Sequence, residues 1–585
     1  MAVHIRRCAA LAAAFSAFLT ACASAPGTGA SAADPVAIEV DQVGYLPGGA
    51  KWAAVRDATA STFAVIDEAT GVAAWHGPLS PPQRWEPARE PLRLAEFSGL
   101  RRPGRYHLEV DGQPPSASFA IAGDAYAALD AAAIKAYYYN RAGIALDAVH
   151  AGAWARPAGH PDDRVRVHAS AAGPGRPEGT IIAAPKGWYD AGDYNKYVVN
   201  SGITVYTLLA AYEQFPAFFQ AQRLDIPESG NGVPDLLGEV LWNLDWMLAM
   251  QDPADGGVYH KLTNQSFDGV VLPHEATSER YVVQKTTAAA LDFAAVMAQA
   301  SRVFAAFESR RPGLSARTLA AARRAWQWAQ AHPAVVYRQP ADIHTGGYDD
   351  DHLDDEFSWA AAELYISTRD DAFWRAMPQP PLQAEVPGWG SVGTLAWISL
   401  AQHRAQLTPA ADQALIERQL GGLASRLRQQ WQASPARVAM QVEDFNWGSN
   451  SNALNQALVL IQGYRLSGDR RELDAAQSAL DYVLGRNPTG YSMVTGFGLR
   501  SPLHPHHRPS GARPNLPPVP GLLVGGPHPG RGGDCKQPYP SEAPAKDYLD
   551  AFCSFTTNEI AINWNAPLVY VSAALQVLTP LPDPS

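Results

Sequence analysis

The chain has 585 residues, of which 47% are hydrophobic and 18% charged, with a formal net charge of −11. This length allows more than one domain and a large core. The negative charge and the lack of a basic stripe argue against nucleic acid as a partner. A neutral polymer or a small molecule is the better match, and the 16 Trp and 22 Tyr would suit a groove for sugar rings, although packing alone can account for them.

The first residues are predicted to be a leader that is not part of the fold. Arg6 and Arg7 precede an apolar run that is too short to span a bilayer, and this run ends in LTAC at Cys22. Residues 1–22 resemble a bacterial lipoprotein signal, with an ordinary secretory signal as the alternative. We therefore expect an exported protein, periplasmic, on the cell surface or secreted, with a linker over 23–34. A lipid on Cys22 would be its only membrane contact.

Residues 35–122 are predicted to form a small β-sandwich. Six or seven short alternating runs are broken by Gly, Pro and Asp in this segment. It contains no cluster of residues that could carry a catalytic reaction.

The segment from 124 to 580 is predicted to be helical. Apolar residues recur at three- and four-residue spacing over roughly a dozen helices, and no strand run between them is strong enough for a βαβ fold. Such helices pack best as a ring of hairpins, whose loops gather at one end and can form a groove. Long Gly- and Pro-rich loops in a compact domain are often functional. The long loops span 151–187, 254–280, 333–354, 378–392 and 488–547.

Two aspartates, Asp190 and Asp193, lie three residues apart in the sequence WYDAGDYNKY. Carboxylates this close repel each other, so at least one must be hydrogen-bonded or have a raised pKa. The pair would suit the binding and deprotonation of one water molecule, with Asp193 as the base and Asp190 holding the same water. An Asx-turn with a helix cap explains the pair equally well.

Glu559 precedes an apolar helix near the C-terminus. A first-turn carboxylate favoured by the helix dipole is one interpretation. Its apolar neighbours, Trp564 among them, would also raise its pKa and keep it protonated as a general acid. Cleavage of a glycosidic bond needs one such acid and one base. The sequence offers both.

Cysteine and histidine patterns bear on disulfides and metals. After the leader only Cys535 and Cys553 remain, and export makes a disulfide between them the expected state. No CxxC motif is present. The sequence HPHHR, from His504 to Arg508, could bind a metal, but it lacks a helical i,i+4 pair and Arg508 would repel the ion.

Several segments together resemble glycoside hydrolase family 9, the cellulases. They are spread from about residue 124 to 578 and read KGWYDAGDYNKYVVNSG, NGVPDLLGEVLWNLDWMLAMQDPADGGVYHKL, DDEFSWAAAELY, LGRNPTGYSMVTGFG, HPHHR and FTTNEIAINWNAPLV. The N-terminal IEVDQVGYLPGGAKWA resembles the immunoglobulin-like module that precedes many catalytic domains of this family.

The resemblance implies a multidomain chain: an immunoglobulin-like β-sandwich over 35–122, then an all-α (α/α)6-barrel catalytic domain over 124–580. It implies cleavage of β-1,4-glucan with inversion, with Asp193 as base, Asp190 assisting and Glu559 as acid. His506 and Arg508 would contact the sugar, and Asp550 belongs to the family's active-site signature. The full expected set of substrate contacts is His506, Arg508, Asp550, Trp188, Tyr189, Trp359, His260 and Trp564.

Zinc and calcium enter through the resemblance, and no cofactor is expected for the chemistry. Some relatives carry a Cys/His zinc site, but here only histidines remain in the matching segment, so zinc is not expected. Relatives also bind calcium through acidic loops beside the barrel, and the resemblance implies a calcium site in the acidic loop of this chain. The alternative is that this loop is only a solvated acidic turn. The expected calcium ligands are Asp350, Asp351, Asp354 and Asp355.

The leading hypothesis is thus an exported, monomeric endo-β-1,4-glucanase acting on cellulose-type glucan or cello-oligosaccharides. Within the same family, an exo-acting cellodextrinase or cellobiosidase and an amino-sugar exo-glycosidase are alternatives, because the loops at the groove ends do not reveal which ends are open. A glycan-binding surface lipoprotein is the non-enzymatic alternative. Metal-dependent hydrolysis at His504–His507 is a further alternative hypothesis.

Overall fold

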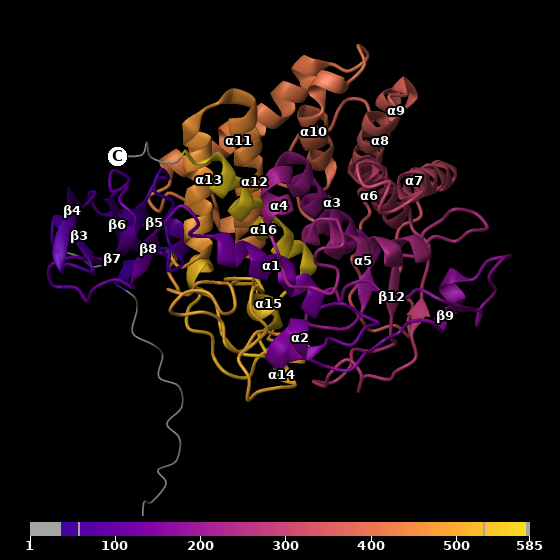
Figure 1. The fold of residues 1–585 in the computed structure, drawn as a ribbon, viewed down its shortest axis with the longest axis horizontal. Coiled ribbons are helices and arrows are strands. Elements are labelled where there is room, and N and C mark those ends of the chain that lie inside the picture. Colours follow the sequence, from indigo (N-terminus) through magenta and orange to yellow (C-terminus); the bar gives the residue numbers. More distant parts are fainter. Residues whose placement is uncertain (1–36, 57–58, 531–532, 581–585) are drawn as a thin grey trace, which may run out of the picture. The chain divides into compact units, whose positions relative to one another are not determined.

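The structure is a computed structural model (Figure 1). It describes residues 37–56, 59–530 and 533–580. The leader predicted over 1–22, with Cys22, and the linker predicted over 23–34 lie outside the described residues.

The N-terminal part consists of two four-stranded antiparallel sheets. One has the order β1 (Ile38–Glu39), β2 (Trp52–Val55), β6 (Glu90–Glu96) and β5 (Gln83–Trp85). The other has the order β4 (Val72–Pro78), β3 (Thr62–Asp67), β7 (Gly104–Glu109) and β8 (Phe119–Ile121). Every second side chain of β3 is buried, because successive residues of a strand face opposite sides. Phe63, Val65, Tyr106 and Leu108 share one core, which confirms the expected β-domain.

The rest of the described chain is mainly helical, as predicted. The longer helices are α1 (Ala127–Tyr139), α3 (Val198–Gln214), α5 (Asp235–Ala249), α6 (Thr287–Ala305), α7 (Leu314–Ala331), α8 (Asp354–Thr368), α10 (Gly393–Gln402), α11 (Gln413–Ala433), α12 (Ser449–Ser467), α13 (Arg470–Val483) and α16 (Ile562–Leu578). The shorter ones are α2 (Ala148–Ala151), α4 (Pro216–Ala221), α9 (Asp371–Ala376), α14 (Arg508–Gly511) and α15 (Phe555–Asn558).

The helices divide into an inner and an outer set. Helices α3, α6, α10 and α16 are buried on nearly all sides, whereas α7 and α11 bury a single apolar stripe. Inner helices pack in the series α16–α3–α6–α8–α10, and α12 packs on α16, while α11 contacts both α10 and α12. Helix α6 is long and apolar enough to cross a membrane by composition, but 89% of its apolar window is buried, as expected of a core helix.

A small sheet lies in loops where the sequence predicts none. Its order is β10 (Ile181–Ile182), β9 (Val165–Val167), β13 (Tyr281–Val282), β12 (Lys261–Thr263) and β11 (Lys196–Tyr197). Strands of two or three residues are too short to show alternation, which explains the omission. The sheet matters because β11 begins three residues after Asp193.

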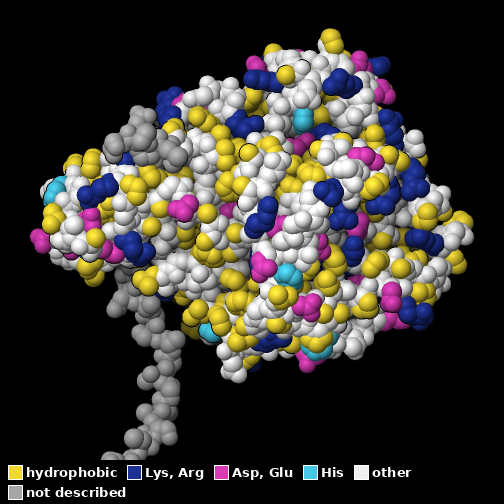
Figure 2. All heavy atoms as spheres, viewed as in Figure 1, with side chains coloured by type: hydrophobic (Ala, Val, Ile, Leu, Met, Phe, Trp, Pro, Cys, Tyr) yellow, Lys and Arg dark blue, Asp and Glu magenta, His cyan; other side chains and the backbone are white. Residues whose placement is uncertain are grey.

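In the described part of the helical region, the segment between α13 and α16 is the longest without a long helix. Figure 1 shows it as orange and yellow loops gathered on one side of the helices, around α14 and α15. A disulfide bond joins Cys535 to Cys553 within it. On the face drawn in Figure 2, basic and acidic side chains are interspersed rather than gathered into a basic stripe.

Candidate functional site

The DAGD turn, Asp190 to Asp193, connects a bridge at Trp188 to strand β11. The N–H of Asp190 donates to the carbonyl of Asn195 (3.1 Å), which closes the turn. The carbonyl of Asp190 accepts from the N–H of Ile562 (2.8 Å), which attaches the turn to the start of α16. Both aspartates are buried, with 2% and 6% of their surface exposed. The turn is therefore held at both ends in the helical core.

Gly192 brings the remaining charged groups to this turn. Its N–H donates to Oε1 of Glu559 (3.3 Å), and its carbonyl accepts from the N–H and Nη1 of Arg508 (3.1 and 2.8 Å). A Cβ at this position would lie 2.4 Å from the carbonyl oxygen of His506. Only glycine therefore allows the close approach. Asp190, Asp193, Glu559 and Arg508 thus meet at one turn.

The two aspartates differ in which oxygens are occupied. Asp190 accepts from Nδ2 of Asn200 (2.6 Å) on one oxygen and from the hydroxyl of Tyr348 (2.7 Å) on the other. Asp193 accepts from Asn195 and, at 3.5 Å, from Tyr197, both on Oδ2. In the described part of the chain, both side-chain donors to Asp193 therefore bond Oδ2. The backbone N–H of Asn195 also donates to the carboxylate of Asp193.

Burial raises the pKa of all three carboxyl groups at this turn. Burial, and then the charge of Asp193, raises the pKa of Asp190 to about 8. Burial raises the pKa of Asp193 as well, while Arg508 opposes the rise. The pKa of Glu559 is raised well above its usual range, first by burial and then by the charge of Asp193. A proton donor at 559 and an acceptor at 193 are the combination that these environments favour.

The HPHHR segment lies beside the same turn. Nδ1 of His506 lies 2.6 Å from the carbonyl of Phe552, so Nδ1 carries the proton and Nε2 is left as an acceptor. The two nitrogens of His507 instead bond Ser510 and Asn140. Since these histidine nitrogens point to different partners, they do not form the metal site considered for His504–His507.

Asp550 bonds the loop that precedes His506. Its two oxygens accept from the N–H groups of Leu503 and His504, both at 2.9 Å, and Oδ1 also accepts from Nδ2 of Asn558 (3.1 Å). These contacts use the carboxylate to hold the loop that carries His506. The expected contact of Asp550 with sugar stays a prediction.

Four other predicted substrate contacts are enclosed in the core. Trp188, Tyr189, Trp359 and His260 have 0–1% of their surface exposed, which leaves no face for a sugar. Trp188 packs on Tyr137, with 4.5 Å between the ring centroids, and His260 stacks on Tyr337 at 4.0 Å. The structure therefore corrects the expectation for these four. Trp564 is only partly buried.

An aromatic pair near the acid was missed from the sequence. Trp447 is 50% exposed, and its ring lies 5.6 Å from that of Phe555, which in turn lies 6.0 Å from the ring of His506. Exposed tryptophans beside polar groups are suited to stacking on sugar rings. The only signal in the sequence was a Trp in the loop before α12.

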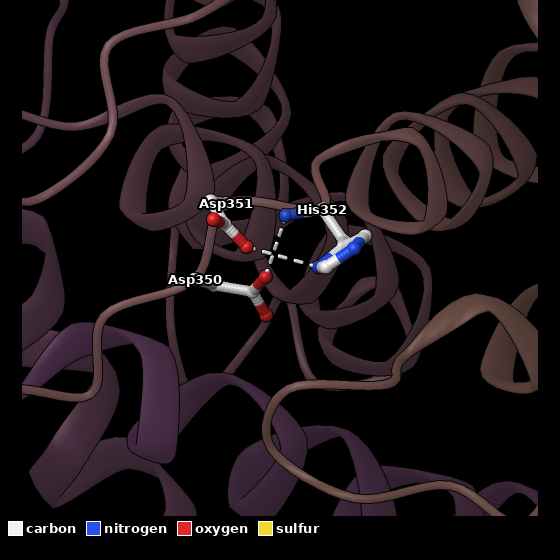
Figure 3. Close-up of side chains that lie close together, drawn as sticks. All are labelled: Asp350, Asp351 and His352. Carbon is white, nitrogen blue, oxygen red and sulfur yellow. Dashed lines mark hydrogen bonds and ion pairs between the residues drawn. The ribbon is translucent and has the colours of Figure 1, made fainter.

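The predicted calcium set is divided by the structure. The ligand atoms of Asp350, Asp351 and His352 lie within 4.8 Å of one another, but Asp351 and His352 are exposed. Figure 3 shows these three side chains close together. Asp354 is also exposed, at the start of α8. Only Asp350 and Asp355 of the predicted four belong to a more buried group.

That group, the buried acid cluster, consists of Asp292, Asp350, Asp355 and Glu356. Both oxygens of Asp292, both of Glu356 and Oδ2 of Asp350 are buried without a hydrogen-bond partner. Burial first, and neighbouring carboxylates second, raise the pKa of Asp292 and Glu356 well above the usual range. Oxygen atoms without donors are the ligands that calcium takes. No three of these four carboxyl groups bring ligand atoms within 4.8 Å of one another, so a bound ion would have to draw the side chains together.

Comparisons with known proteins agree with this site. The model for glycosyl hydrolase family 9 matches residues 126–572, and that for the cellulase N-terminal ig-like domain matches 34–114. The chain is 42% identical over 558 residues to a xyloglucan-specific endo-β-1,4-glucanase of Bacteroides ovatus, covering 93% of this chain and 94% of that protein. It is 32% identical over 545 residues to endoglucanase D of Acetivibrio thermocellus (92% and 83% covered). A solved Bacteroides ovatus family 9 structure has a TM-score of 0.87 at 41% identity, covering 93% of this chain and 99% of that chain.

Proposed function

The chain belongs to glycosyl hydrolase family 9, and on that premise we propose that it is an inverting endo-β-1,4-glucanase. Asp193 acts as the base that activates water, Asp190 assists, and Glu559 is the acid that protonates the leaving oxygen. The helical domain is a closed (α/α)6 barrel with these residues at one end. The observation that carries this assignment is the hydrogen bond from the N–H of Gly192 to the carboxyl group of Glu559. Gly192 directly precedes Asp193 in the chain, so this bond brings the acid close to the base.

The chemistry follows from the environments of the two carboxyl groups. Glu559, kept protonated by burial, donates its proton to the glycosidic oxygen as the bond breaks. Oδ1 of Asp193 removes a proton from the water that attacks the opposite face of the sugar. His506 and Arg508 bind the sugar next to this linkage, and the Trp447–Phe555 pair provides a stacking surface.

The decisive measurement is the anomer of the first product. We expect NMR of cellohexaose hydrolysis to show the α-anomer before mutarotation, and carboxymethyl cellulose to lose viscosity early, as internal cleavage requires. Formation of the β-anomer would exclude inversion. Release of one small product without loss of viscosity would favour the exo-acting alternative, and binding without turnover would favour the glycan-binding alternative.

Xyloglucan should be tested as a substrate beside cellulose-type glucan. A relative that is 42% identical over almost its whole length is described as xyloglucan-specific, which favours a branched glucan as a substrate here. Xyloglucan, mixed-linkage glucan, carboxymethyl cellulose and a chitosan oligomer should be compared by kcat/KM under one set of conditions. The chitosan oligomer serves as the test for the amino-sugar alternative.

We also propose that the buried acid cluster holds a structural calcium ion. The five oxygens without donors would serve as ligands, and the ion would supply the positive charge that the four carboxylates lack. Asp350 follows Tyr348, the donor to Asp190, by two residues, so the ion would also hold that loop.

Removal of calcium should lower the melting temperature, and more so at higher pH. Carboxyl groups whose folded-state pKa is raised contribute stability below the unfolded pKa and lose it as pH rises through the folded pKa. We therefore expect chelation to lower Tm by several degrees at pH 8 and by little at pH 5, as measured by scanning fluorimetry. Asp292→Asn should weaken the calcium effect, whereas the exposed control Asp351→Asn should not. An equal response of both variants would contradict the cluster as the site.

The proposal of export is supported by the disulfide. A bond between Cys535 and Cys553 suits an oxidising compartment, such as the periplasm or the cell exterior. Lipidation of Cys22 remains part of this proposal, and mass spectrometry of the mature N-terminus tests it.

A further inference from the structure

Oδ2 of Asp193, the oxygen opposite the one assigned to the attacking water, is held by the side chain of Asn195. Nδ2 of Asn195 donates to Oδ2 of Asp193, and both side chains are buried. A donor to a carboxylate favours its charged form. Because the bond occupies only Oδ2, it also fixes the direction in which Oδ1 points.

The orientation of the Asn195 amide is itself fixed. Its Oδ1 accepts from the backbone N–H of Asn264 (3.0 Å) and from the hydroxyl of Thr263 (3.0 Å). A backbone N–H can only donate, so an amide turned by 180° would place its NH2 group against a donor. The amide therefore has one favourable orientation, with its NH2 group toward Asp193.

Hydrogen bonds continue from Thr263 to a buried cation. Thr263 and Thr345 join through their hydroxyls (2.7 Å), and Nζ of Lys261 donates to the Thr345 hydroxyl (3.0 Å). Lys261 has 0% of its surface exposed, and burial lowers its pKa to about 7. Each member can donate to the next, in the order Lys261, Thr345, Thr263, Asn195 and Asp193. The hydroxyl proton of Thr263 has a second acceptor in the carbonyl of Asn264 (2.9 Å), and the relay requires that it go to Asn195. Bonds aligned in one direction strengthen one another.

We propose that Asn195 is a positioning residue, and that this relay from Lys261 fixes the carboxylate of Asp193 and stabilises its charged form for catalysis. The proposal rests on the proposed function of Asp193 as base. The small sheet places the parts, since Lys261 and Thr263 are the ends of β12, which pairs with β11 directly after Asn195. The other charged or titratable groups around Asp193 are Arg508, Arg280, Asp190, Glu559 and Tyr197.

The test compares Asn195→Ala and Thr263→Val with wild type over a range of pH. Loss of the donor should raise the pKa of Asp193, so the acid limb of kcat/KM should move upward by about one to two pH units in Asn195→Ala. The shift in Thr263→Val should be smaller, and Thr263→Ser should restore the wild-type profile. Asn515→Ala, at an exposed position, is the matched control and should leave the profile unchanged. Substrate binding, measured in an inactive Glu559→Gln background, should stay the same.

A second readout separates this proposal from the function on which it rests. Water-soluble carbodiimide labels protonated carboxyl groups, and peptide mass spectrometry can follow labelling at Asp193 without any turnover. We expect Asn195→Ala to extend labelling of Asp193 to higher pH than in wild type. An unmoved labelling curve and an unmoved acid limb would overturn the relay even if glucan hydrolysis is normal. Absence of hydrolysis in wild type, with a shifted labelling curve, would instead overturn the function and leave the relay in place.

Discussion

Asp193→Asn is expected to lower kcat on cello-oligosaccharides by about 10³-fold or more, because a positioned general base typically contributes 10²–10⁴-fold. The amide cannot accept the proton of the attacking water, but it has nearly the shape of the carboxylate. Binding of cellohexaose, measured by calorimetry, should therefore remain close to that of wild type. Reducing-end assays and calorimetry on the same preparation check the two halves of this expectation.

The control for this variant is Asp163→Asn, which removes a carboxylate at an exposed position. It should have the activity of wild type. A residual rate of Asp193→Asn within about tenfold of wild type would mean that another group serves as base. Asp190 is the first alternative, although both of its oxygens are already bound by Asn200 and Tyr348.

Glu559→Gln should be equally damaging on natural substrates but far less so on activated ones. An alkoxide leaving group needs the proton of Glu559, whereas a dinitrophenolate leaves without one. We expect a loss of about 10³-fold on cellohexaose and a much smaller loss on an aryl β-cellobioside, measured side by side. Equal losses on both substrates would show that Glu559 is not the acid.

The pH dependence provides the second check on Glu559. As an acid it is active when protonated, so activity should fall as pH rises through its pKa, which burial raises well above the usual range. Asp193 is active when charged, so activity should fall as pH decreases through its pKa, which burial also raises. Wild-type kcat/KM should thus be bell-shaped, and Glu559→Gln should lack the alkaline limb on the aryl substrate.

The candidate catalytic residues were identified from the sequence through the resemblance to family 9, because the spacing of Asp190 and Asp193 alone is explained equally well by an Asx-turn. The structure brings Asp190, Asp193 and Glu559 to one turn. The two domain types were also predictable, since alternation and helical periodicity extend over many residues in each. Signals of this kind are repeated, so errors at single positions matter little.

Single side chains were harder to predict, because sequence does not reveal which face of a turn meets solvent. Trp188 and Tyr189 adjoin Asp190 in sequence, yet both point into the core. Asp292 lies within α6 between Leu291 and Phe293, where nothing marks it as part of the buried acid cluster. These positions depend on contacts between segments far apart in the chain, which local patterns do not record.

The disulfide has a practical consequence for anyone preparing this enzyme. Cys553 precedes Glu559 by six residues, and Asp534, the neighbour of Cys535, accepts hydrogen bonds from the N–H (3.1 Å) and the hydroxyl (2.8 Å) of Thr556. Protein made in the reducing cytoplasm of an expression host would lack this cross-link just upstream of its acid. Recombinant material should therefore be directed to the host periplasm or refolded with an oxidant, and its free thiols counted before specific activities from different laboratories are compared.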